Sequence, residues 1–161
     1  MSKIYSFIHF DAPIGKGRPK FVKDGYIGKD GKRHYAYTPS KTSKAEIAIA
    51  WSAKQAIGAP ALTGPLAIVF HVFCKPPQSW SASKIKRCIE NEAELPGKKP
   101  DIDNIIKLYC DALNNIAWVD DRQIVTCIIH KRYAWQNAVR VTFWEIPKQI
   151  ELEEINSHGQ I

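Results

Sequence analysis

The stretch Lys99–Asp121, KPDIDNIIKLYCDALNNIAWVDD, decides how the rest of this sequence is interpreted. Its apolar residues recur every three to four positions, which predicts a helix that begins after Pro100 and packs one face on a core. Those apolar positions are Ile102, Ile105, Ile106, Tyr109, Ala112, Leu113 and Ile116. Asp103, Lys107 and Asp111 step by four along a different face. The stretch therefore joins a core helix to a line of charged side chains.

Two interpretations of the carboxylates in this stretch stay open from the residues alone. In the structural one, Asp101 or Asp103 caps the helix, Asp103 pairs with Lys107, and Asp120-Asp121 is a polar turn. In the chemical one, three carboxylates hold a divalent metal for phosphodiester hydrolysis, and Lys107 stabilises the charge that develops. Those three are Asp101, Asp103 and Asp121, and their oxygen ligands favour magnesium.

The chemical interpretation carries a geometric requirement. A helix of about 14 residues is roughly 20 Å long, so Asp121 cannot meet Asp101 across one straight helix. The connection Asn114–Asp120 must therefore carry the chain back, so that the third carboxylate returns to the first two.

The composition is that of one globular domain. The chain has 161 residues, of which 45% are hydrophobic and 24% charged, enough to bury a core. No apolar run approaches the roughly 20 residues that span a bilayer. The N-terminal residues lack the apolar stretch of a signal peptide, so we expect a cytoplasmic protein with no membrane partner. The four cysteines form no CxxC pair and are interpreted as reduced residues, and the five histidines are scattered singly.

The positive charge is concentrated in Lys16–Lys44. This segment holds nine Lys and Arg and two Asp, a sum of +7, which equals the net charge of the whole chain. Four aromatic residues lie among these bases, namely Phe21, Tyr26, Tyr35 and Tyr37. Such a mixture suits nucleic-acid binding, because bases stack on the rings and phosphates pair with the cations. A solvated basic hairpin with its aromatics packed beneath it is the alternative that stays open.

Strands and helices alternate around the organising helix. We expect a strand over Ile4–Phe10, a β ribbon or ordered loop up to Tyr37, a helix from Thr38-Pro39 to about Ile57, a strand over Leu66–Cys74, a polar helix from Ser81 or Ser83 to about Leu95, a strand over Gln123–Tyr133 and its hairpin partner over Val139–Ile146. The strand Leu66–Cys74 is apolar on both faces, which predicts a central position in the sheet. The fold class is therefore α+β: a single domain, 1–147, with a mixed sheet packed with helices, followed by a polar acidic tail, 148–161.

Several motifs resemble those of one known family, the RusA family of Holliday junction resolvases. The main ones are KPDIDNIIK at Lys99–Lys107, DALN at Asp111–Asn114 and AWVDDRQI at Ala117–Ile124. Similar segments in the same order are GRPK at Gly17–Lys20, YTP at Tyr37–Pro39 and PPQSWS at Pro76–Ser81. The resemblance covers most of the chain, roughly from Ile4 to Ile146.

This resemblance implies a dimeric, magnesium-dependent endonuclease, with Mn²⁺ as a possible substitute metal. It implies that Asp101, Asp103 and Asp121 are the catalytic metal ligands and that Lys107 is the catalytic lysine. Asp111 also matches a family position, and we interpret it as a structural or supporting carboxylate.

The expected function is the resolution of Holliday junctions by paired nicks, in DNA repair and recombination. A homodimer would place one active site at each of the two equivalent strands of a four-way junction. Backbone contacts are expected from Arg18, Lys20, Lys23, Arg33 and Lys41, so binding should weaken as salt rises. The alternatives are a non-catalytic DNA-binding module and a nuclease for other branched DNA, such as flaps or forks.

Overall fold

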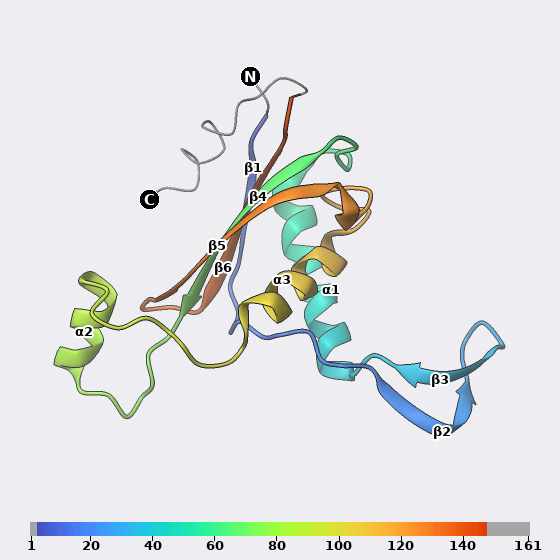
Figure 1. Ribbon diagram of the computed structural model, residues 1–161, viewed down its shortest axis with the longest axis horizontal. Helices are drawn as coiled ribbons and strands as arrows, with labels where there is room; N and C mark the ends of the chain where they lie inside the picture. The colour runs from blue at the N-terminus through green and yellow to red at the C-terminus, as the bar shows by residue number, and fades with distance from the viewer. Residues whose placement is uncertain (1–2, 148–161) are drawn as a thin grey trace.

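A computed structural model describes residues 3–147, in which four strands form one mixed sheet (Figure 1). The strands are β1 (Tyr5–His9), β4 (Leu66–Cys74), β5 (Ile124–Tyr133) and β6 (Ala138–Glu145), in the order β1-β6-β4-β5. Strand β6 pairs antiparallel with β1 and β4, whereas β5 runs parallel to β4. The predicted α+β class with a mixed sheet is therefore confirmed. The predicted acidic tail, 148–161, lies outside the described residues.

Strand β4 lies inside the sheet, as its apolar sequence predicts. Its first seven residues, Leu66–Val72, are all buried. The predicted hairpin between β5 and β6 is wrong, because β4 lies between these two strands. Their connection crosses the end of β4, where the Ala134 N–H donates to the Cys74 carbonyl at 2.9 Å. The apolar sequence of β4 predicts a central position, but it does not show which strands lie on its two edges.

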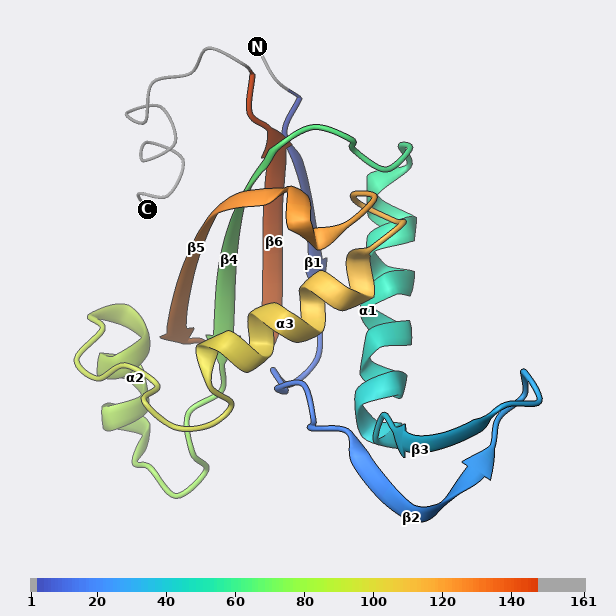
Figure 2. The ribbon, with the colours of Figure 1, turned by 45° about the vertical axis from the view of Figure 1, so that its right-hand side comes forward.

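Two helices, α1 (Ser40–Ile57) and α3 (Ile102–Leu113), cover one face of this sheet (Figure 2). Gly58, at φ 55°, ends α1 in the left-handed region. The apolar face predicted for α3 is largely confirmed, since Ile105, Tyr109 and Leu113 are buried, whereas Ile102 is 42% exposed. Leu108, which was not among the predicted positions, is also fully buried. Burying side chains of this size stabilises the fold by about 1.5–3 kcal/mol each. This packing fixes α3 against the sheet and so fixes the position of the charged face of the helix.

The basic segment forms a separate two-stranded ribbon, β2 (Lys20–Ile27) and β3 (Arg33–Tyr37). The ribbon projects away from the sheet and joins it through α1 (Figures 1 and 2). Its tip contains Gly31, whose φ of 73° suits a residue without a side chain. The remaining helix, α2 (Ala82–Glu90), begins at the predicted Ser81 cap but ends five residues before Leu95.

The cysteine and membrane predictions can be compared with residues 3–147. All four cysteines are free, with Cys88 and Cys110 buried and Cys127 exposed. Over the same residues, no helix is both long enough and apolar enough to cross a membrane.

Candidate active site

The first turn of α3 presents two carboxylates that the fold does not use. Asp101 is the N-cap residue, and its carbonyl accepts the Ile105 N–H at 3.1 Å, yet its side chain makes no capping hydrogen bond. Asp103 follows in the first turn, and both side chains are exposed. The predicted capping by Asp101 is therefore absent. The positive end of the helix dipole favours negative charge at this turn.

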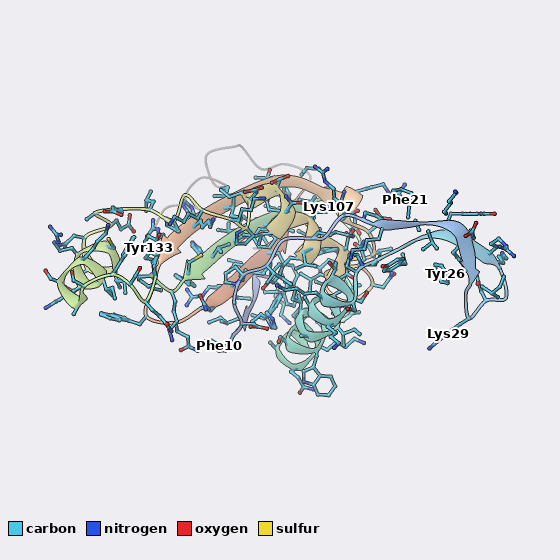
Figure 3. All side chains as sticks on the ribbon, turned by 90° about the horizontal axis from the view of Figure 1, so that it is seen from below. Phe10, Phe21, Tyr26, Lys29, Lys107 and Tyr133 are labelled. Atoms are coloured by element: carbon cyan, nitrogen blue, oxygen red, sulfur yellow. The ribbon has the colours of Figure 1, made fainter. Side chains whose placement is uncertain are left out.

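Lys107 lies one turn along α3 from Asp103 and is exposed at the surface (Figure 3). Among the ion pairs of residues 3–147, none joins Asp103 to Lys107. The structural interpretation, a cap followed by an ion pair, therefore does not account for these side chains. The carboxylate pair and the ammonium group are left facing solvent.

Strand β5 holds the turn that leads into Asp101. The Lys131 ammonium donates to the Pro100 carbonyl at 2.9 Å and also to the Lys98 carbonyl. The Lys99–Pro100 peptide bond in this turn is cis. Sequence reasoning missed Lys131, for which the available signal was the run His130-Lys131-Arg132 near the end of a strand that begins apolar. Its contacts anchor the backbone before Asp101 to the sheet.

The N-terminal segment lies against the other side of α3. The Lys16 N–H donates to the Asn104 carbonyl at 2.9 Å, and a Cβ atom added to Gly15 would lie 2.9 Å from the Asn104 Cβ. The Gly17 N–H donates to the Thr42 Oγ1 at 3.1 Å. The glycines of the GKG sequence therefore permit a close approach to both helices.

This approach forms a groove of about 470 Å³ beside Asp101. Lysines 16, 41 and 99 are among its lining residues. Lys41 was predicted as a DNA contact, whereas Lys16 and Lys99 were not singled out. A carboxylate flanked by three cations offers a place for a metal next to a place for a phosphate backbone.

Asp111 belongs to the scaffold of the helix pair. The Lys16 ammonium forms an ion pair with Asp111 on α3 and lies 3.7 Å from a Glu46 oxygen on α1. Asp111 therefore has a partner, which agrees with its interpretation as a structural or supporting carboxylate.

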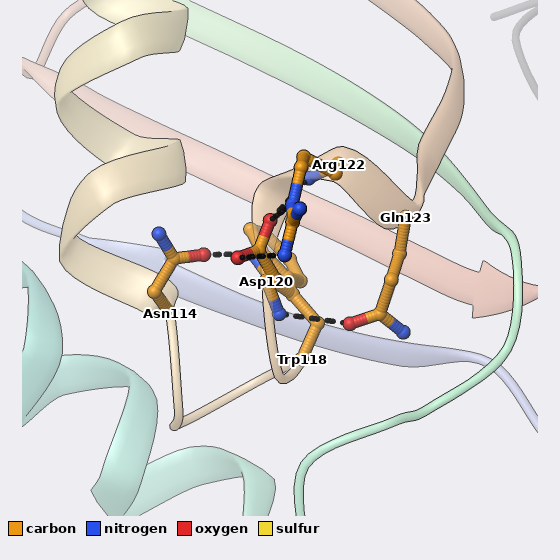
Figure 4. A network of polar contacts seen from close by, with 5 residues as sticks. All are labelled: Asn114, Trp118, Asp120, Arg122 and Gln123. Atoms are coloured by element: carbon orange, nitrogen blue, oxygen red, sulfur yellow. Dashed lines mark hydrogen bonds and ion pairs between the residues drawn. The ribbon is translucent and has the colours of Figure 1, made fainter.

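Asp120 also has a structural role, because it caps the short 3₁₀ helix η1 (Asp121–Gln123) (Figure 4). Its carboxylate accepts the Arg122 N–H at 2.9 Å and the Arg122 Nε–H at 2.8 Å, and these bonds lower the pKa of Asp120. The Gln123 amide donates to the carbonyls of Leu62 and Gly64 at 3.0 and 2.9 Å. This capping box fixes η1 to the segment before β4.

Asp121 begins η1 and is partly buried. Figures 1 and 2 both show η1, the short orange turn before β5, beside the C-terminal half of α3. Burial raises the pKa of Cys110, and the negative charges of Cys127 and then Asp121 raise it further, to about 12. Asp121 is thus near Cys110, two turns along α3 from Asp103.

The structure brings two of the three predicted ligands together. Asp101 and Asp103 share the first turn of α3, whereas Asp121 lies toward the other end of the helix. Within residues 3–147, no three His, Cys, Asp or Glu side chains lie close enough to hold a metal ion together. The donor chemistry of Asp101 and Asp103 fits a hard divalent cation, since both offer oxygen atoms that no protein group occupies.

All five cations predicted to contact DNA are exposed, and four of them lie on or next to the ribbon. The Arg33 guanidinium donates to the Asp24 carbonyl at 2.6 Å. Phe21 is 83% exposed and Tyr35 is 56% exposed, so these two rings do not pack beneath the ribbon. Tyr26 instead stacks on His34, with ring centroids 5.5 Å apart. The ribbon therefore displays both cations and aromatic faces.

Two comparisons relate this chain to known proteins. The family model described as endodeoxyribonuclease RusA matches residues 12–143. The chain is also similar to the uncharacterized protein YqaN of Bacillus subtilis (strain 168). The two are 33% identical over 141 residues, which cover 87% of this chain and 95% of that protein. The matched region includes both carboxylates of the α3 turn, Lys107, Asp121 and the ribbon.

Proposed function

This chain belongs to the RusA family of endodeoxyribonucleases, and from that premise we propose that it resolves Holliday junctions by paired nicks. The observation that carries the proposal is the first turn of α3. Within residues 3–147, the carboxylates of Asp101 and Asp103 have no ion-pair partner, and Asp101 lines a groove with lysines in the region that matches the family. Such a turn suits phosphodiester hydrolysis.

Each residue of the site has a distinct task in this proposal. Asp101 and Asp103 would hold Mg²⁺, for which Mn²⁺ can substitute, and Asp121, which lies toward the other end of α3, would have to approach them to serve as a third ligand. The metal would supply charge neutralisation and an activated water when bound. Lys107 stabilises the charge that develops on the scissile phosphate. Lys131 holds the turn before Asp101, so the first carboxylate keeps its position.

The substrate is bound mainly through its backbone. Arg18, Lys20, Lys23, Arg33 and Lys41 contact phosphates, which carry little sequence information. Binding therefore weakens as salt rises. A homodimer presents one site to each of the two equivalent strands of a four-way junction, which explains paired nicks. Light scattering on the full chain tests that stoichiometry.

The deciding experiment is cleavage of a labelled four-way junction by the parent chain and by Asp103→Asn with Mg²⁺. We expect paired nicks by the parent, and binding without nicks by the variant. Lys107→Ala should slow cleavage by on the order of 10²–10³-fold. Asp11→Asn is a matched control, because its exposed carboxylate accepts only the Ala12 N–H. Binding without nicks by the parent, in Mg²⁺ and in Mn²⁺, would instead identify a non-catalytic DNA-binding module.

Two further comparisons refine the proposal. Asp121→Asn tests the carboxylate that lies apart from the other two, and unchanged cleavage by this variant would remove Asp121 from the ligand set. Flap and fork substrates, compared with the junction, test selectivity. Faster cleavage of flaps or forks would make the protein a nuclease for other branched DNA.

A further inference from the structure

The face of the sheet opposite α1 and α3 carries a row of basic side chains. Arg140 on β6, His71 on β4 and His130 on β5 occupy directly paired positions across three neighbouring strands. The rings of His71 and His130 are stacked at 5.4 Å with 10° between their planes. Arg132 follows His130 by two residues, so it lies on the same face of β5. These four residues are called the basic row below.

His71 is the unusual member of the basic row. It is only 8% exposed, and neither of its ring nitrogens has a hydrogen-bond partner in the part of the chain that the structure describes. A buried polar group without a partner costs about 1–3 kcal/mol, so such groups are rare unless a ligand or water satisfies them. The mechanism proposed above makes no use of His71.

The charged groups that shift the pKa of His71 are all basic. Burial lowers the pKa of His71, and the neighbouring His130, Arg140 and Arg132 lower it further. Within residues 3–147, the Glu92 carboxylate lies 2.8 Å from the Arg132 guanidinium and is paired with it. An anion is the kind of ligand that complements the positive charge around His71.

A groove connects the basic row with the candidate active site. His130 and Arg132 line a groove of about 620 Å³ along the free edge of β5, and Asp101 lines the same groove. Lys98, Lys131 and one carboxylate, Glu92, also line this groove. The groove therefore extends from Asp101 to the two basic residues of β5 that belong to the row.

We propose that His71, His130, Arg132 and Arg140 form a second phosphate-binding site, on the face of the sheet away from the catalytic carboxylates. The oxyanion accepts hydrogen bonds from the ring N–H of His71 and from the Arg140 guanidinium, and satisfies the buried ring. Protonation of His71 adds a second donor, so the site binds more tightly as pH falls. That the phosphate belongs to DNA rests on the proposed function; phosphate binding itself does not.

The first test uses inorganic phosphate and NMR signals of the histidine rings, at constant ionic strength. We expect phosphate to shift the His71 signals saturably and to raise the pKa of His71. Arg140→Gln should weaken this response on the order of tenfold, because it removes a charged donor. The matched control Arg87→Gln removes the same charge from an exposed position on α2 and should leave the response unchanged. A His71 response no larger than that of His34, which lies on the ribbon and is partly buried, would overturn the site.

The second test identifies the source of the phosphate. If it is a DNA phosphate, Arg140→Gln should lower the salt slope of junction binding by about one, whereas Arg87→Gln should not. A His71 response to inorganic phosphate with an unchanged salt slope would assign the site to free phosphate. A chain that binds phosphate at His71 but fails to cut junctions would keep this site and disprove the proposed function.

Discussion

The β2–β3 ribbon and the four-stranded sheet are both β structure, but they use their side chains in opposite ways. The sheet buries rings such as Phe70 and Phe143, each 0% exposed, whereas the ribbon exposes Phe21 at 83%. A two-stranded ribbon has no second layer to cover its rings, and alone it is at most marginally stable. The difference indicates that the sheet supplies stability and positions the carboxylates, and that the ribbon is a surface for a partner.

The largest expected effect comes from paired aromatic substitutions. Trp118→Ala removes a fully buried ring whose Nε1–H donates to Asn114 at 3.0 Å, and should lower the free energy of unfolding by about 3–5 kcal/mol. Phe21→Ala should change it by about 0.5 kcal/mol or less, yet weaken junction binding by about 1–3 kcal/mol through lost stacking. Urea denaturation and fluorescence titration measure the two quantities. An equal loss of stability in both variants would show that Phe21 packs as a core residue.

A histidine of the sheet, His9 on β1, should make the stability depend on pH. Burial lowers the pKa of His9 below 6.5, and its Nδ1 lies 2.9 Å from the Ser52 Oγ. The unfolded chain therefore binds more protons than the folded protein between the lowered pKa and 6.5. Consequently, the free energy of unfolding should fall as pH drops through this window.

Denaturation midpoints measured between neutral and mildly acidic pH check this prediction. The slope should be smaller in His9→Gln than in the parent chain, because the variant has no ring to protonate. An unchanged slope would assign the effect to other groups.

The smallest effect is expected from single cations of the ribbon. Lys23→Gln should lower the salt slope of junction binding by about 0.9 and leave stability unchanged. Lys54→Gln, an exposed lysine near the end of α1, removes the same charge and is the matched control. Equal losses of affinity in the two variants would mean that net charge, rather than the ribbon, attracts DNA.

The same contrast explains what could be predicted from sequence. The helix of the organising stretch and the strand Leu66–Cys74 were predicted closely, because period and apolar runs are local properties. The partner of β6 was predicted wrongly, because pairing across the sheet is decided by which edges remain open. The turn residues between β5 and β6 predicted a hairpin of these two strands, but in the sheet β4 lies between them.

The candidate site divides in the same way. Asp101, Asp103 and Lys107 come from one helix, so their spacing already determined their relative positions. Asp121 depends on how the chain returns after α3, and the Gln123 contacts that fix this return join residues about 60 positions apart. Lys16 and Lys131 were missed for the same reason, because each reaches α3 or its preceding turn from a distant element.

The pairing of β1 with β6 has a consequence for the order in which the chain folds. Tyr5 pairs with Phe143, and β4 pairs with β5 across a shorter but still long separation, from Leu66 to Ile124. Contacts between such distant residues form slowly. During synthesis, β1 must wait for almost the whole domain before its partner strand leaves the ribosome, whereas the ribbon can close within its own 18 residues. The β2–β3 ribbon can therefore form long before the sheet on which α3 packs, and β1 is an unpaired strand that the nascent chain must keep from aggregating.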